Sequence, residues 1–244
     1  MGRLQAVGIM KMAKTASNSM LNSELPPTYC EMHGSLPAQR ASSLQSPVAY
    51  MYNTMMTSPN MAAILSAAEA ETTLRIHFPE TTVSKAATNV TIAASASTPT
   101  LAVSAAALQR FQPQPGTKYM AFSLDLDAPF PSFPILGPIL HGVQADLVVR
   151  DPDADGFVTL QGPAEWQVVP YVGPGPPKPS APHRYVFTIF AQPEGLDAAQ
   201  VKTALGLDGR GTGLLPRIRW DQAAAEKRIG LGEVVAGNYF VTRG

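Results

Sequence analysis

The sequence has little cysteine and little charge, and both shortages exclude classes of protein. Its single cysteine, Cys30, allows no disulfide within the chain and no C-x-x-C redox or zinc motif. Only 15% of the 244 residues are charged, and 18 basic side chains balance 18 acidic ones. A neutral chain without a Lys/Arg cluster offers no electrostatic surface for nucleic acid or for an acidic membrane.

Long apolar runs and the motifs of common enzyme classes are also missing. No stretch approaches the ~20 apolar residues of a membrane span, and the apolar segment 4–10 is short for a signal peptide. The sequence contains no G-x-S-x-G elbow, P-loop, H-E-x-x-H or dinucleotide fingerprint. We therefore expect a soluble, cytoplasmic protein with no metal, no cofactor, no nucleic-acid partner and no integral membrane contact.

The first quarter of the chain differs in composition from the rest. Residues 1–60 are rich in Met, Ser, Asn and Pro and show no sustained period of two or of 3.6. Such a segment cannot bury much surface. We expect residues 1–60 to be a disordered leader or an extension of the gene model, with a regulatory arm as the alternative. Residues 61–244 are expected to form one domain.

Short apolar segments separated by Pro and Gly predict an all-β architecture from residue 74 onward. The expected strands are 74–78, 90–92, 101–103, 119–126, 145–149, 157–160, 185–190 and 238–241. Helix is expected mainly near the C-terminus. Asp197 can cap a short helix to residue 205, and Asp221 can cap one to residue 229.

Two aspartates end the strand expected at 119–126. Asp125 and Asp127 are two residues apart, so in a strand they would share a face, and Ala128-Pro129 then forces a turn. One interpretation is that the carboxylates line a polar pocket. The other is that they accept backbone N–H groups at the strand end.

A second polar segment begins with Gly173 and Gly175 among five prolines and ends at His183 and Tyr185. The two last residues would share one face of a strand. Glycines permit close backbone approach to a ligand, so a His/Tyr face beside them suits a phosphate or carboxylate. A rigid edge loop with a core tyrosine is the alternative. His141, taken alone, is typical of a hydrogen-bonded structural residue.

The acidic segment 151–156 matches the opening of an EF-hand calcium loop. The twelfth position of that loop would be Gly162, where the motif requires a bidentate Glu, and Pro152 fits poorly. The flanking segments also predict strands rather than helices. We therefore expect an acidic hairpin turn without calcium.

In their order and spacing, these motifs resemble the two signature boxes of the phosphatidylethanolamine-binding protein family, fungal type. The motifs are Asp125-x-Asp127-Ala128-Pro129, His141, Gly173-x-Gly175-Pro176-Pro177 and His183-Arg184-Tyr185. The resemblance covers about residue 70 to the end. It implies a mainly β fold in which a large antiparallel sheet packs on a smaller one, with short C-terminal helices.

The resemblance also implies a small anion-binding pocket. Its ligand-binding residues would be Asp125, Asp127, Pro129, His141, Gly173, Gly175, His183 and Tyr185. Asp125, His141 and His183 are the candidate catalytic residues, and His141 paired with Asp125 is expected to act as a base. Leu126 and Gly142 replace a proline and an aromatic that are usual in the family, and we expect them to open the pocket mouth to a bulkier ligand.

The resemblance suggests two functions. Fungal relatives encoded with polyketide synthases are implicated, beside ketosteroid-isomerase-like partners, in coupling maleic-anhydride monomers into maleidrides. The first hypothesis is therefore that this protein binds an anionic anhydride or carboxylate intermediate of such a pathway and helps to cyclise or dimerise it. The alternative is a non-catalytic phospholipid- or phosphate-binding regulator of a kinase or protease.

Overall fold

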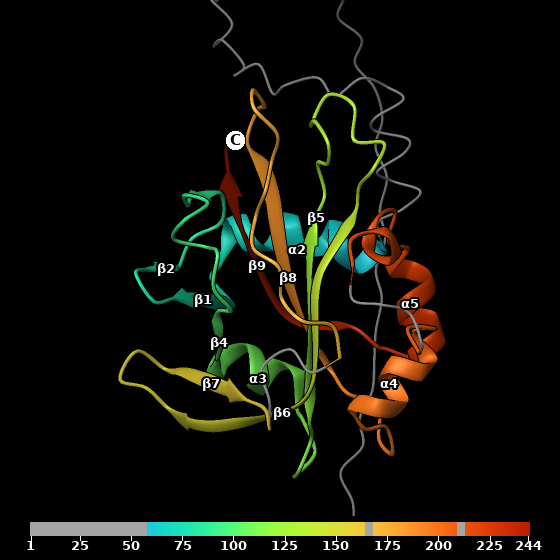
Figure 1. Ribbon diagram of the computed structural model, residues 1–244. Coiled ribbons are helices and arrows are strands. Elements are labelled where there is room, and N and C mark those ends of the chain that lie inside the picture. Colours follow the sequence, from blue (N-terminus) through green and yellow to red (C-terminus); the bar gives the residue numbers. More distant parts are fainter. Residues whose placement is uncertain (1–57, 164–167, 209–212) are drawn as a thin grey trace, which may run out of the picture. The chain divides into compact units, whose positions relative to one another are not determined.

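Strands dominate the computed structural model, which describes residues 58–163, 168–208 and 213–244 (Figure 1). They are β1 (Leu74–Phe78), β2 (Thr81–Val83), β3 (Thr88–Asn89), β4 (Thr100–Ser104), β5 (Tyr119–Asp125), β6 (Ile139–Pro152), β7 (Phe157–Gln161), β8 (His183–Ala191) and β9 (Val234–Thr242). Their order is β2-β1-β4-β7-β6-β5-β8-β9-β3. The expected leader lies outside the described residues, apart from its last three positions.

The long strand β6 joins two halves of this sheet. Its first part pairs with β5 and its second part with β7, and the register shifts where Asp146 adopts a φ of 56°. A bulge of this kind bends a strand and redirects the residues beyond it. The larger half contains β6, β5, β8, β9 and β3, and the smaller half contains β2, β1, β4 and β7. All pairings are antiparallel except β3 with β9, so the expected fold is confirmed.

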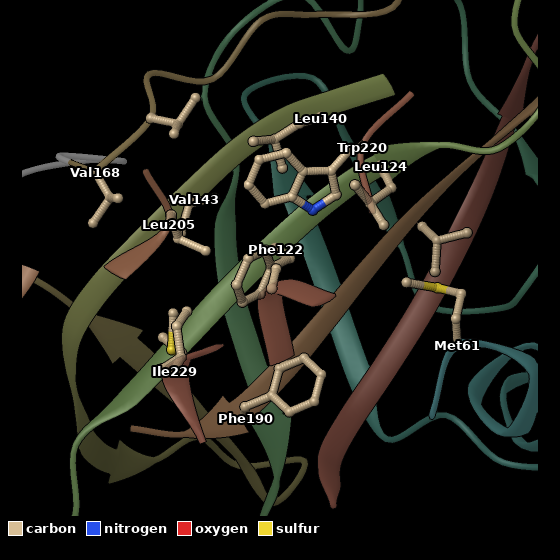
Figure 2. Close-up of a cluster of buried hydrophobic side chains, with 14 of the residues drawn as sticks. Met61, Phe122, Leu124, Leu140, Val143, Val168, Phe190, Leu205, Trp220 and Ile229 are labelled. Carbon is tan, nitrogen blue, oxygen red and sulfur yellow. The ribbon is translucent and has the colours of Figure 1, made fainter. Parts of the chain in front are cut away.

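Each face of the larger half buries its own core. Tyr185, Phe187 and Ile189 of β8 face the smaller half, while the intervening Val186 and the following Phe190 face the helices. This alternation arises from the two-residue period of a strand. The helix-side core, drawn in Figure 2, adds side chains from three helices to those of β5 and β6.

Two C-terminal helices match the prediction. Helix α4 (Ala198–Ala204) begins with a capping box in which the Asp197 and Gln200 side chains bond each other's backbone N–H. Helix α5 (Gln222–Ile229) is capped by Asp221 and ends at Gly230, whose φ is 78°. A short 3-10 helix, η1 (Leu215–Arg217), precedes α5.

Two further helices and the short strands β2 and β3 were not predicted, and one expected strand is wrong. Helix α2 (Pro59–Ala70) is capped by Ser58, and α3 (Ala105–Phe111) is capped by Ser104. The expected strand at 90–92 is wrong, because the chain pairs with β9 at β3 and then turns. Serine followed by proline is a helix-start signal, but only three side chains of α2 are buried, so its apolar pattern is weak.

Helix α2 crosses the helix-side face of β8 and β9 (Figure 1). Met61 and Ile64 are buried there, and Gly237 of β9 makes room for Ile64. A Cβ at Gly237 would lie 2.5 Å from Cγ2 of Ile64, so only glycine permits this close packing. Helix α2 thus starts at Pro59, two residues before the position expected to open the domain, and the boundary itself stays a prediction.

The acidic segment forms the turn between β6 and β7, as expected. Oδ1 of Asp153 accepts the backbone N–H groups of Asp155 and Phe157, and Arg75 lies 3.0 Å from Asp155 and 3.5 Å from Asp153. These carboxylates are thus occupied within the protein. Within 58–163, 168–208 and 213–244, no group of three or more His, Cys, Asp or Glu side chains is arranged to hold a metal ion.

The helices in these ranges are all too short or too polar to cross a membrane.

Candidate functional site

A cavity of about 550 Å³ opens where β5 ends and where β6 and β8 begin. Loops that follow β5, precede β8 and precede η1 complete its wall. The lining residues are Asp125, Ala128, Pro129, Leu136, Ile139, Leu140, His141, Val172, Gly173, Gly175, Pro177, His183, Gly213, Leu214 and Arg217. Of the eight expected ligand-binding residues, six line this cavity, namely Asp125, Pro129, His141, Gly173, Gly175 and His183.

Asp125 and His183 form a buried pair in the wall. Nδ1–H of His183 donates to Oδ2 of Asp125 at 2.9 Å. Asp125 is 4% exposed and His183 is 1% exposed. The other oxygen of Asp125 accepts the backbone N–H of Asp127, so the carboxylate is held in place. Strand pairing explains the contact, because Asp125 lies opposite Tyr185, two residues from His183.

This pairing favours the protonated imidazole. Burial opposes the charge, but the hydrogen bond to Asp125 and the charges of Asp125 and Asp127 together raise the pKa of His183. Nε2 of His183 is buried and forms no hydrogen bond of normal geometry with a described residue, and the Pro129 carbonyl is the nearby acceptor that favours the charged ring. A cationic N–H in a cavity wall is a strong donor for an anion.

His141 has the opposite character. Its Nδ1–H donates to the carbonyl of Val172, so Nε2 carries the lone pair of the neutral ring. Burial lowers the pKa of His141, and the positive charges of Arg217 and His183 lower it further, although Asp125 opposes them. The expected partner of His141, Asp125, acts on this ring through its charge, whereas its carboxylate bonds His183 and the loop before β8 supplies the hydrogen-bond partner of His141.

The Tyr185 ring packs against both imidazoles. The ring of Tyr185 meets the ring of His141 edge-on, with 5.1 Å between the ring centroids. It stacks on the ring of His183, with 6.4 Å between the ring centroids. Burial raises the pKa of Tyr185, and both the charge of Asp125 and a hydrogen bond to Asp125 raise this pKa further. Tyr185 is therefore a neutral phenol that sets the spacing of the two histidines and does not itself line the cavity.

Asp127 does not line the cavity either. It forms a two-pronged ion pair with Arg184, with N···O distances of 2.7 and 2.8 Å, and it also accepts the backbone N–H of Arg184. Strand β5 ends at Asp125, so the strand alternation that would place both carboxylates on one face no longer applies. Asp125 faces the cavity, whereas Asp127 anchors the start of β8.

The glycines of the second segment have different roles. A Cβ at Gly173 would lie 2.8 Å from Cα of Ala96, so this glycine allows two loops to touch. A Cβ at Gly175 would meet nothing within 4 Å. Gly175 therefore leaves part of the cavity open, and the close backbone approach to a ligand that the sequence suggested stays a prediction at this position.

The sequence did not reveal Arg217 or the apolar wall. Arg217 is 4% exposed, and its Nη1 donates to the carbonyls of His141 at 3.0 Å and Leu140 at 3.4 Å. It belongs to a segment without periodicity or a recognisable motif, so no signal marked it. Leu214 and Val172, 59% and 49% exposed, add an apolar rim to the cavity.

The two substitutions expected to widen the mouth do not lie there. Leu126 is buried in the helix-side core, and Gly142 pairs with Ser123 inside the sheet. Neither residue lines the cavity. That expectation is therefore wrong, and the apolar rim comes from other residues.

Most of the described chain matches known proteins. The sequence pattern of the family described as Phosphatidylethanolamine-binding protein matches residues 69–240. Phomoidride biosynthesis cluster protein N of Talaromyces stipitatus is 32% identical over 126 residues, which are 51% of this chain and 59% of that protein. Carboxypeptidase Y inhibitor of Saccharomyces cerevisiae is 36% identical over 73 residues, which are 30% of this chain and 32% of that protein. The matches thus span less than two thirds of either relative's length.

A solved structure shares the fold. The crystal structure of carboxypeptidase Y inhibitor complexed with the cognate proteinase matches with a TM-score of 0.54 and 20% sequence identity. The match covers 82% of this chain and 98% of that chain. At this identity the likeness establishes the architecture alone.

Proposed function

The chain belongs to the phosphatidylethanolamine-binding protein family, and from this premise we propose that its cavity binds an anionic organic molecule with an apolar body. The observation that carries the proposal is Nε2 of His183, a buried nitrogen of a cavity-lining residue that forms no hydrogen bond of normal geometry with a described residue. Desolvation of a polar nitrogen costs free energy unless a partner is present. A carboxylate or phosphate oxygen would supply that partner.

The walls favour an apolar body attached to the anionic group. Leu136, Ile139, Leu140 and Val172 line the cavity, and Leu214 extends the apolar surface to its rim. A volume of about 550 Å³ lies in the range of sites that bury drug-sized ligands. An anion as small as phosphate would leave most of this apolar surface exposed to water.

The biological setting that we propose is fungal secondary metabolism. One relative is a phomoidride biosynthesis cluster protein. We propose that the ligand is a carboxylate or anhydride-derived intermediate of a polyketide pathway, and that this protein helps to cyclise or dimerise it. A ketosteroid-isomerase-like protein is the proposed partner in that reaction.

A titration series tests the binding proposal. Octanoate should bind at least tenfold more tightly than acetate, because burial of two methylenes at about 0.8 kcal/mol each already exceeds the ~1.4 kcal/mol of a tenfold change. His183→Asn should weaken octanoate binding, since it keeps a donor for Asp125 and removes the charged Nε2–H. His77→Asn is the matched control, because His77 lies in β1 and bonds Thr82 outside the cavity. Equal binding of acetate and octanoate would contradict the apolar-body proposal.

The alternative is a regulator of a protease that uses the same pocket for phosphate. A carboxypeptidase Y inhibitor is among the relatives, and its structure was solved in complex with the cognate proteinase. This alternative requires O-phosphoethanolamine to bind more tightly than octanoate. It also requires the protein to inhibit carboxypeptidase Y at stoichiometric concentration, with octanoate bound weakly or not at all.

A further inference from the structure

The cavity holds two imidazoles whose hydrogen bonds make them chemically different. Nδ1–H of His183 donates to the carboxylate of Asp125, and Nδ1–H of His141 donates to the carbonyl of Val172. A carboxylate stabilises a charged imidazolium more than a carbonyl does, and at His141 burial outweighs the effect of the carbonyl. One wall therefore presents a cationic N–H donor and the other a lone-pair nitrogen.

Tyr185 fixes both rings against the same space. His141 meets its edge and His183 stacks on its face, and both histidines line the cavity. Each ring is also fixed at its Nδ1 atom, so its Nε2 atom has one orientation. Pairs of titratable groups held in opposite protonation states are the arrangement that acid–base chemistry requires.

We propose that Nε2 of His141 removes a proton from the carbon next to a carbonyl group of the bound anion, while Nε2–H of His183 donates to the oxygen on which negative charge develops. This inference rests on the proposed function, because the anion must first bind. The reaction class is enolisation of a carbonyl compound that also carries a carboxylate or anhydride group. It is the step that turns such a compound into a carbon nucleophile for coupling.

The step balances without any further reactant. The C–H bond breaks, its electron pair becomes the new C=C bond, and the carbonyl π pair moves to oxygen. The proton moves to Nε2 of His141, and the enolate oxygen accepts a hydrogen bond from His183. Return of the proton restores the starting compound, so in D₂O each cycle replaces hydrogen with deuterium.

Two directions of pKa shift agree with this assignment. Burial lowers the pKa of His141, and although burial also opposes charge on His183, the bond to Asp125 raises the pKa of that ring. Between the two pKa values, the base is free and the acid is protonated. The other titratable or charged groups that face these rings are Asp125, Asp127, Tyr185 and Arg217.

The test is deuterium exchange into 2-oxooctanoate, followed by loss of its C3 proton signal in NMR spectra. The probe has a carboxylate, an adjacent carbonyl and an alkyl chain, and pyruvate is the control without the chain. The protein should accelerate exchange of 2-oxooctanoate more than that of pyruvate. His141→Asn keeps a donor for Val172 but lacks the basic Nε2, so exchange should fall at least about a hundredfold with binding retained. His77→Asn should exchange like the parent protein.

The outcomes separate the two proposals. If 2-oxooctanoate does not bind to the parent protein, the proposed function fails. If it binds but exchanges no faster than in buffer, or if His141→Asn exchanges as fast as the parent, the inference is overturned. Should that variant not fold, the parent's pH profile decides. The rate should rise as His141 loses its proton and fall as His183 loses its own, and a profile without a maximum contradicts the inference.

Discussion

Replacement of Asp125 by asparagine should favour the neutral form of His183 and thereby weaken anion binding. Asp125→Asn keeps the size of the side chain and can keep a hydrogen bond to His183, but it removes the negative charge that raises the pKa of that ring. Burial then favours neutral His183. A hydrogen bond to a charged group contributes about 1.5–3 kcal/mol, so octanoate binding near neutral pH should weaken by about tenfold to a hundredfold.

The size of this loss should depend on pH in a defined direction. Because Asp125 raises the pKa of His183, the ring stays charged to a higher pH in the parent protein than in Asp125→Asn. The ratio of the two dissociation constants should therefore be larger at about pH 8 than at about pH 6. Isothermal titration calorimetry with octanoate, which stays ionised across this range, measures both values.

Asp155→Asn is the matched control for this experiment. Asp155 is exposed, belongs to the β6–β7 turn and pairs with Arg75. The substitution removes one negative charge without touching the cavity, so it should leave octanoate binding unchanged. If Asp125→Asn is folded and binds octanoate as tightly as the parent at both pH values, the charged pair does not drive binding.

Three further predictions concern the cavity, the start of the domain and the anchor of β8. Gly175→Leu should fill the cavity and abolish octanoate binding, whereas Gly232→Leu, equally open at Cβ, should bind normally; equal binding would place the ligand elsewhere. Ser58→Ala should lower the free energy of unfolding by about 1 kcal/mol through loss of the helix cap. A fragment beginning at Ser58 should melt within a few degrees of the full chain, and a large drop in its melting temperature would show that earlier residues stabilise the domain. Asp127→Ala should lower the free energy of unfolding by about 3 kcal/mol in chemical denaturation, because it leaves the partly buried Arg184 without its carboxylate partner. A loss below about 1 kcal/mol would show that the pair is only a surface contact.

Local sequence signals predicted much of the fold. Strand β1 was predicted with its observed bounds, and α4 and α5 with their caps, because alternation and capping residues act over a few positions. Helix α2 was not predicted, because the packing of its buried face depends on a glycine in β9 that lies far along the chain. The position of β6 across both halves likewise depends on a long-range pairing that no local pattern encodes.

The site was predicted in its members but not in its pairings. Most of the cavity-lining members of the motifs were named in advance, yet Asp125 was assigned to His141 instead of His183. Residue types and spacing suggest which groups converge, whereas the partner of each nitrogen depends on strand register and on the loop that brings Val172 to His141. Arg217 was missed because only tertiary structure brings η1 to the cavity.

The protonation states of the two cavity histidines test the account most directly. ¹⁵N NMR of the imidazole nitrogens at about pH 7 should show His183 protonated on both nitrogens and His141 protonated on Nδ1 alone. Addition of octanoate should shift the Nε2 resonance of His183 and leave that of His77 in place. If His183 is neutral, or if octanoate binds without changing its Nε2 signal, then this histidine does not hold the anion and the central claim is wrong.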